Sequence, residues 1–124
     1  MRRLRILIVD DSDFVRSTAA EFLRDEGHVV TEARDGQRAL DLFDREGAEL
    51  ILLDIQMPGM SGLDVADALV GRDPQLPIFA FTAMPQVIGD KRPLFQDVFV
   101  KPVSLVRLSA ELDAFIERSE NRSA

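Results

Sequence analysis

The sequence predicts a single α/β domain built on a doubly wound, five-stranded parallel sheet. Short apolar runs alternate along the chain with segments that carry apolar residues at helical spacing. Most of these runs are apolar throughout, which is typical of parallel strands buried on both faces. The length of 124 residues fits one domain. Right-handed crossovers would then place helices on both faces of the sheet.

The first half of the chain contains three apolar runs separated by two helical segments. The first run stops abruptly at Asp10, and the helical spacing that follows continues from Val15 to Leu23. Gly27 and Gly47 end the two helical segments. The predicted order is a strand at 6–9, a helix between 12 and 27, a strand at 29–33, a helix between 36 and 47, and a strand at 50–53.

The second half begins with a loop at 56–62, in which Pro58 and two glycines interrupt regular structure. The expected order after this loop is a helix up to Gly71, a strand at 77–81, a short strand at 98–100 and a final helix that starts near Ser104. Three helix-breaking residues lie in the segment 83–97, namely Pro85, Gly89 and Pro93. A short or irregular fourth helix is therefore predicted there.

Composition narrows the classes of function. The absence of cysteine excludes disulfides and thiolate metal sites, so a cytoplasmic location is expected. No apolar run is long enough to cross a bilayer, and no membrane insertion is predicted. A formal net charge of -7 makes direct DNA binding unfavourable.

Residues that can bind a ligand or take part in a reaction follow four of the five predicted strands. They are Asp10 and Asp11, Asp54, Thr82 and Ala83, and Lys101 with Pro102. Each of these residues alone is more often a helix cap or a solvated charge. Because ligands of open α/β sheets bind at the carboxyl ends of the strands, we expect the group to form one site.

Three carboxylates at one site would repel each other unless a cation lies among them. Mg²⁺ fits such a site, because it prefers oxygen ligands and often binds phosphate as well. Asp54 could then act as a nucleophile that forms an acyl phosphate, with Lys101 neutralising charge on the phosphoryl oxygens. The Thr82 hydroxyl and the backbone N–H of Ala83 could bind another of these oxygens.

The residues at these strand ends match a known family. The matching motifs are Ile8-Val9-Asp10-Asp11-Ser12 with Arg16, Ala33-Arg34-Asp35-Gly36 with Ala39-Leu40, Leu53-Asp54-Ile55-Gln56-Met57-Pro58 with Gly62, Phe81-Thr82-Ala83, and Val100-Lys101-Pro102. Along essentially its whole length the chain resembles the receiver domain of bacterial two-component response regulators. The resemblance implies a flavodoxin-like fold with strand order 2-1-3-4-5.

The resemblance also implies a signalling role. Asp54 would accept a phosphoryl group from a histidine kinase or phosphotransfer protein and thereby switch partner binding. Such a domain promotes its own phosphorylation and slow dephosphorylation, and is not otherwise an enzyme. Thr82 and Lys101 would contact the phosphoryl group, and the Lys101-Pro102 bond would be cis. The implied Mg²⁺ ligands are Asp11 and Asp54 directly, Asp10 mostly through water, and the Gln56 backbone carbonyl.

The resemblance predicts one receiver domain over residues 1–124. Because the tail is polar and contains no core residue, a frayed end is expected at 119–124. Because the chain begins at Met1 and ends soon after its last helix, no attached effector domain is expected. A stand-alone regulator and a receiver taken from a larger protein both stay open. Val98 departs from the family, which commonly has an aromatic residue at this position. The neighbouring Phe99 would point to the opposite face of its strand.

Two other functions fit parts of the pattern. An aspartyl phosphatase of the haloacid dehalogenase type also uses aspartate, threonine, lysine and Mg²⁺, but it needs a second acid where this chain has Gln56. A flavodoxin-like FMN carrier needs a phosphate-binding loop in place of Asp10 and Asp11, and an aromatic ring to stack the flavin. The chain has no tryptophan or tyrosine.

Several other residues are expected to have no special role. His28, the single histidine, is interpreted as a surface residue away from the site. Met57 and Met60 are expected to pack the loop around Pro58. Most of the eight phenylalanines are assigned to the core.

Overall fold

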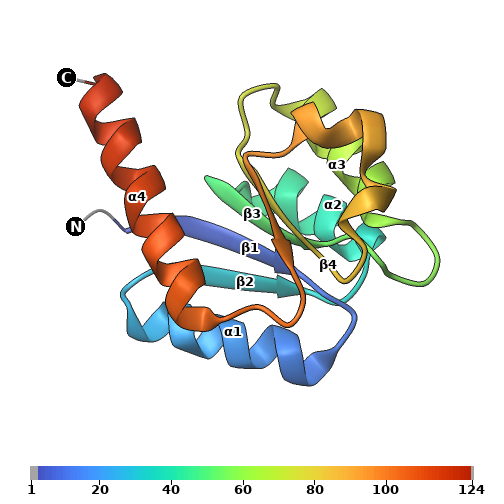
Figure 1. Ribbon diagram of the computed structural model, residues 1–124, viewed down its shortest axis with the longest axis horizontal. Coiled ribbons are helices and arrows are strands. Elements are labelled where there is room, and N and C mark those ends of the chain that lie inside the picture. The colour runs from blue at the N-terminus through green and yellow to red at the C-terminus, as the bar shows by residue number, and fades with distance from the viewer. Residues whose placement is uncertain (1–2, 124) are drawn as a thin grey trace.

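The computed structural model describes residues 3–123, in which a parallel sheet lies between two layers of helices (Figure 1). The strands are β1 (Arg5–Val9), β2 (Val29–Ala33), β3 (Leu50–Asp54), β4 (Ile78–Thr82) and β5 (Asp97–Val100). They are arranged in the order β2-β1-β3-β4-β5, and every neighbouring pair is parallel. The predicted fold class and strand order are confirmed.

Two helices pack on each face of the sheet. Helices α1 (Asp13–Asp25) and α4 (Leu105–Ser123) cover one face, and α2 (Gly36–Glu46) and α3 (Gly62–Arg72) cover the other (Figure 1). β3 and β4 are buried at every position, as their continuous apolar sequences predicted. Within residues 3–123, no helix combines the length and the apolar character that a membrane span needs.

The segment between β4 and β5 is irregular, as predicted. It contains two short 3₁₀ helices, η1 (Pro85–Val87) and η2 (Gly89–Leu94), in place of a full α-helix. Pro93 lies inside η2 and has no N–H to donate. Ile88 and Phe95 are buried against the face that α3 covers, so the segment is anchored to the sheet by two apolar side chains.

The two neighbouring residues on β5 pack on opposite faces of the sheet. Phe99 is buried in the core beneath α4, with its ring centroid 5.5 Å from that of Phe81 and 5.7 Å from that of Phe79. Val98 packs on the other face, beside the irregular segment. The prediction that Phe99 points away from Val98 is confirmed, so Phe99 does not replace the aromatic residue common at position 98.

His28 is buried, so its interpretation as a surface residue was wrong. Only 7% of the residue is exposed, and its Nδ1 accepts a hydrogen bond from the Leu4 N–H at 3.1 Å. Gly27 is in the left-handed region with φ of +99°, which lets the chain turn sharply from α1 into β2. This turn brings the imidazole beneath the start of β1. The histidine is therefore a structural acceptor at the end of the sheet opposite the strand-end cluster.

The chain end also differs from its expectation. A frayed segment was expected at 119–124, whereas α4 continues as a helix to Ser123. The sequence after the buried Ile116 contains no glycine or proline, and it includes good helix formers such as Glu117 and Arg118. Residue 124 lies outside the described residues. Among the phenylalanines, Phe14 is an exception to core packing, since it is 78% exposed.

Candidate functional site

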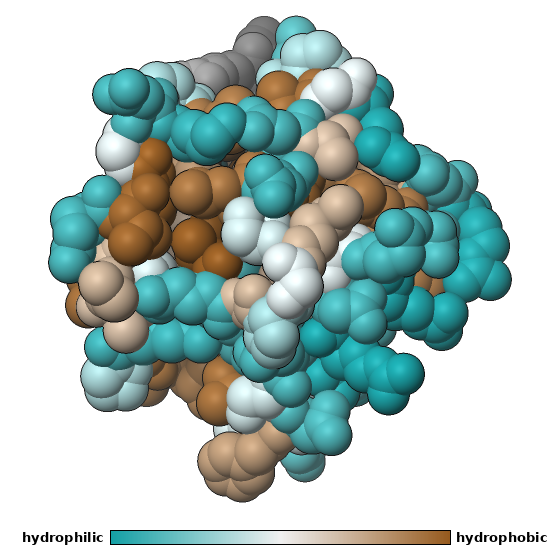
Figure 2. Space-filling view, turned by 90° about the vertical axis from the view of Figure 1, so that its right-hand side faces the viewer, coloured by the Kyte–Doolittle hydropathy of each residue, from teal (hydrophilic) through white to brown (hydrophobic). Residues whose placement is uncertain are grey.

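The strand ends that carry the predicted site residues lie at one edge of the sheet. β1 and β2 run toward the right-hand side of Figure 1, and the other strands are parallel to them. Figure 2 shows the molecule from that side, where polar residues cover most of the surface and apolar patches lie among them. The site is therefore at a mostly polar surface.

Three carboxylates meet at this edge. Asp10, Asp11 and Asp54 each provide an oxygen, and these oxygens lie within 4.8 Å of one another. Asp10 and Asp54 are buried, at 2% and 1% exposure, whereas Asp11 is exposed. The expected convergence of these residues is confirmed. Such a group of hard oxygen donors, open to solvent on one side, suits a divalent cation.

The loop after β1 fixes the orientation of Asp10. Its Oδ1 accepts a hydrogen bond from the Ser12 N–H at 2.9 Å. Ser12 in turn is the N-cap of α1, where its hydroxyl accepts from the Val15 N–H. The residue that turns Asp10 toward the site is thus the residue that starts the helix.

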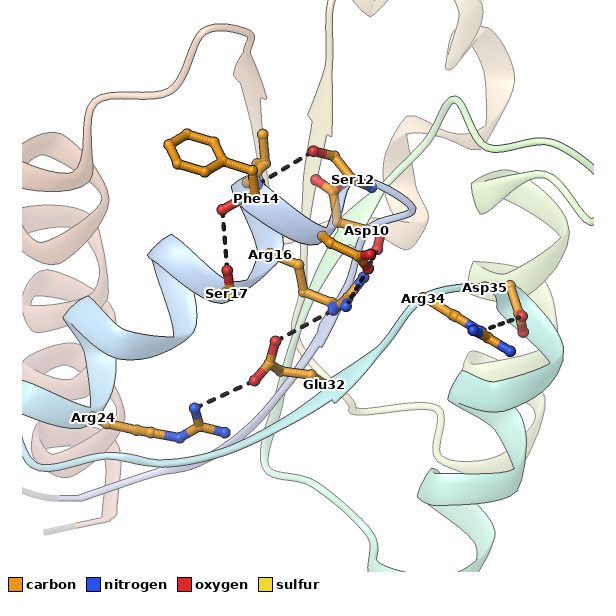
Figure 3. Close-up of polar contacts among 11 residues, drawn as sticks. Asp10, Ser12, Phe14, Arg16, Ser17, Arg24, Glu32, Arg34 and Asp35 are labelled. Atoms are coloured by element: carbon orange, nitrogen blue, oxygen red, sulfur yellow. Dashed lines mark hydrogen bonds and ion pairs between the residues drawn. The ribbon is translucent and has the colours of Figure 1, made fainter.

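Arg16 supports this loop from below (Figure 3). Its guanidinium donates to the Asp10 carbonyl at 2.8 Å, to the Asp13 carboxylate at 2.7 Å and to the Glu32 carboxylate at 3.3 Å. Arg24 pairs with the other oxygen of Glu32 at 3.3 Å. Arg16 belongs to the matching motif, but no role was predicted for it from the sequence. The structure shows that it ties the acidic loop to α1 and β2.

Among the described residues, Lys101 is the cation that pairs with the two buried carboxylates. Its Nζ lies 3.2 Å from Asp54 Oδ1 and 3.6 Å from Asp10 Oδ2. The Lys101-Pro102 peptide bond is cis, as the resemblance implied. The backbone N–H of Lys101 donates to the Thr82 carbonyl, so the ends of β4 and β5 are joined next to the site.

The Asp54 carboxyl has a perturbed acidity. Burial raises its pKa to about 6, and repulsion from Asp10 acts in the same direction. Attraction and hydrogen bonding from Lys101 partly oppose this rise in pKa, as does the hydrogen bond from the Gln56 N–H. Both of these donors contact Oδ1. Among the described residues, the Gln56 N–H and Lys101 therefore both act on the same oxygen of the Asp54 carboxylate.

Two hydrogen-bond donors lie at the end of β4. The Thr82 hydroxyl donates to Gln56 Oε1 at 3.0 Å, and the Ala83 N–H donates to the same oxygen at 3.1 Å. The Met84 N–H donates to Thr82 Oγ1 at 3.0 Å and so fixes that hydroxyl. Gln56 was expected at the site through its backbone carbonyl, whereas the hydrogen bonds of its side chain with Thr82 and Ala83 were not predicted.

The fold and this arrangement of side chains define an α/β domain of the CheY-like class. The chain belongs to the response regulator receiver domain family, whose family model matches residues 6–113. This is a family of signalling domains. The assignment favours the receiver interpretation over the aspartyl phosphatase and the flavin carrier.

Relatives with a similar sequence are response regulators. The chain is 38% identical over 117 residues to the sensory transduction protein RegX3 of Mycobacterium tuberculosis, covering 91% of this chain and 51% of RegX3. It is 34% identical over 124 residues to the response regulator MprA of the same species, covering 98% and 54% respectively. The chain therefore spans about half the length of the curated relatives it matches.

Solved structures share the fold over a comparable length. The chemotaxis protein CheY4 of Vibrio cholerae superposes with a TM-score of 0.84 at 26% sequence identity. The superposition covers 91% of this chain and 98% of CheY4. This similarity extends over the sheet and its helices, and it agrees with the family assignment.

Proposed function

We propose that this chain is a phosphoacceptor in two-component signal transduction, in which Asp54 takes a phosphoryl group from a histidine kinase or phosphotransfer protein. The observation that carries this proposal is the position of Asp54. Its buried carboxylate lies within the acidic cluster, next to Lys101 and on the same edge as the donors of Thr82 and Ala83. These groups provide a nucleophile together with positive charge and hydrogen-bond donors for a phosphoryl group.

In the proposed transfer, an Asp54 oxygen attacks phosphorus in line with the bond to the donor nitrogen. The oxygen–phosphorus bond forms as the nitrogen–phosphorus bond breaks, and the imidazole leaves with the bonding electron pair. Lys101 balances the charge on the phosphoryl oxygens. The Thr82 hydroxyl and the Ala83 N–H bind one of these oxygens. The product is an acyl phosphate on Asp54.

We propose that Mg²⁺ binds at the acidic cluster. The three carboxylates share a single nearby cation, Lys101, so the described side chains carry an excess of negative charge that a divalent ion would balance. Asp11 and Asp54 would bind the ion directly, Asp10 mostly through water, and the Gln56 carbonyl would provide a further oxygen. When bound, the ion supplies positive charge to the phosphoryl oxygens.

A protein phosphodonor is supported by the surface next to the site. An apolar groove of about 470 Å³ lies between the start of α1 and the start of α4, with Lys101 in its wall. Phe14 and Val15 line this groove, and both are exposed, at 78% and 46%. Apolar side chains this exposed beside a reactive carboxylate are typical of a surface that another protein covers.

The proposal predicts that Asp54 is the only phosphoacceptor. Wild-type protein incubated with acetyl phosphate and Mg²⁺ should gain the mass of one phosphoryl group in intact-protein mass spectrometry. Asp54→Asn should gain none, because an amide is not a nucleophile of this kind. Asp64→Asn is the matched control, since Asp64 is an exposed carboxylate in the first turn of α3, and it should behave as wild type. A phosphoryl group retained by Asp54→Asn would contradict the assignment.

Mg²⁺ should raise the melting temperature of the wild-type protein. The ion binds the cluster formed in the folded state and relieves a repulsion that the unfolded chain lacks. At ten times its dissociation constant, the ion should add about 1.4 kcal/mol to the free energy of unfolding. Asp11→Ala should lose this response while its metal-free melting temperature stays equal or rises. Thermal circular dichroism with and without Mg²⁺ measures these melting temperatures. An equal rise in the wild type and in Asp11→Ala would show that the ion binds elsewhere.

A further inference from the structure

The side chain of Gln56 occupies the position of a ligand at the end of β4. A single oxygen, Oε1, accepts from both the Thr82 hydroxyl and the Ala83 N–H, at 3.0 and 3.1 Å. These are the two donors that the proposed function assigns to a phosphoryl oxygen. The amide oxygen of Gln56 thus takes the hydrogen bonds that the phosphoryl group would need.

We infer that Gln56 is a self-masking residue, whose side chain must leave Thr82 and Ala83 before a phosphoryl group or a tetrahedral anion can bind there. The inference rests on the proposed function and concerns regulation of the same site. A hydroxyl and a backbone N–H each have one hydrogen to donate. Neither donor can serve Gln56 and a phosphoryl oxygen fully at the same time, so the masked and bound states exclude each other.

A phosphoryl oxygen at the site is a better acceptor for the two donors than the Gln56 amide oxygen is. A phosphoryl oxygen carries negative charge, and charge-assisted hydrogen bonds are roughly twice as strong as those to a neutral amide oxygen. A ligand that enters must still displace Gln56, so its apparent affinity is reduced by the fraction of molecules that are unmasked. The mask therefore lowers affinity for free anions without blocking the transfer.

The surroundings allow Gln56 to leave without a wider rearrangement. Gln56 is exposed, so its released amide can be solvated by water. Thr82 is fully buried, and its oxygen still accepts from the Met84 N–H at 3.0 Å. The two donors thus remain in place, and only one exposed side chain has to move. Gln56 also keeps its backbone hydrogen bond to Asp54 Oδ1, which does not depend on the side chain.

Binding of beryllofluoride, an analogue of the phosphoryl group, tests this inference in the presence of Mg²⁺. Gln56→Leu keeps the bulk of the side chain but removes the acceptor, and it should bind beryllofluoride about tenfold more tightly in isothermal titration calorimetry, since two neutral hydrogen bonds no longer compete. Gln56→Ala should show a similar gain. Gln96→Leu is the matched control, because it makes the same substitution at an exposed glutamine that lies beside the start of β4, away from the site. It should bind as wild type does.

Hydrogen exchange provides a readout that needs neither metal nor phosphoryl group. In metal-free protein, the Ala83 amide should exchange about tenfold faster in Gln56→Leu than in wild type, since its acceptor has been removed. The masking would be overturned if the Ala83 amide exchanged at the same rate in Gln56→Leu and wild type. It would also be overturned if the two proteins bound beryllofluoride with affinities within twofold of each other. A gain in affinity for Gln56→Ala alone would also overturn it, because bulk would then be the cause. Failure of the wild type to bind beryllofluoride would instead contradict the proposed function.

Discussion

Asp54→Asn should be more stable than the wild type in metal-free buffer at pH 7, by on the order of 2 kcal/mol in the free energy of unfolding. The wild-type carboxylate is charged at this pH, although burial and the neighbouring Asp10 raise its pKa to about 6. Asparagine has nearly the same shape and no charge. Its side-chain oxygen can still accept from the Gln56 N–H, and Lys101 keeps Asp10 as a partner at 3.6 Å.

The same substitution should remove a pH dependence. Because the pKa of Asp54 is raised from its ordinary value of 3.8 to about 6, the folded state binds this proton more tightly than the unfolded chain does. The stability from this group is therefore fully present below about pH 4 and is lost as the pH rises through about 6. The advantage of Asp54→Asn should shrink from its value at pH 7 to near zero at pH 4.

Urea denaturation followed by circular dichroism at several pH values would measure this difference. Asp64→Asn serves as the control, because its carboxylate is exposed and lies outside the acidic cluster. It should show no comparable gain at pH 7. A stability difference between Asp54→Asn and the wild type that stays constant from pH 4 to pH 7 would show that burial of this charge is not its cause.

The sequence predicted the layers of the fold because burial leaves a clear pattern. Strands such as Leu50–Asp54 and Ile78–Thr82 are apolar up to their last residue and are covered by helices on both faces. The order of the strands could not be predicted in this way. Apolar runs indicate which segments are buried but not which strands are neighbours. The order 2-1-3-4-5 was implied only by the family resemblance.

The members of the site could be predicted from their positions at strand ends, whereas their contacts could not. Asp10, Asp11, Asp54 and Lys101 converge because parallel strands end at one edge. The contact of Gln56 with Thr82 and Ala83 depends on one side-chain conformation. Apolar periodicity carries no information about such a conformation.

His28 was misinterpreted for a related reason. A polar residue between a glycine and a strand was expected to be exposed, because most polar side chains lie at the surface. The sharp turn at Gly27 brings the imidazole under Leu4, where a backbone N–H needs an acceptor. The need for an acceptor arises from tertiary packing, so the local sequence does not reveal it.

Gly62→Ala should be strongly destabilising, since this glycine lies directly against the backbone that carries Asp54. A Cβ atom at position 62 would lie 2.5 Å from the Asp54 carbonyl oxygen and 2.5 Å from the Ile55 Cα. Contacts this short force the backbone to move, and the Gly62 N–H would be pulled from its hydrogen bond to the Ile55 carbonyl. We expect a loss of about 3 kcal/mol in the free energy of unfolding.

Gly71→Ala on the same helix provides the matched control. A Cβ atom there meets nothing within 4 Å, and position 71 lies within α3, so alanine should stabilise the protein by roughly 0.5 to 1 kcal/mol. Urea denaturation of both variants would separate the effect of the close contact at position 62 from the effect of helix propensity. Because the strain falls on the backbone of Asp54, Gly62→Ala should also lose part of its stabilisation by Mg²⁺. A Gly62→Ala protein as stable as Gly71→Ala would show that α3 does not press against the end of β3 in this way.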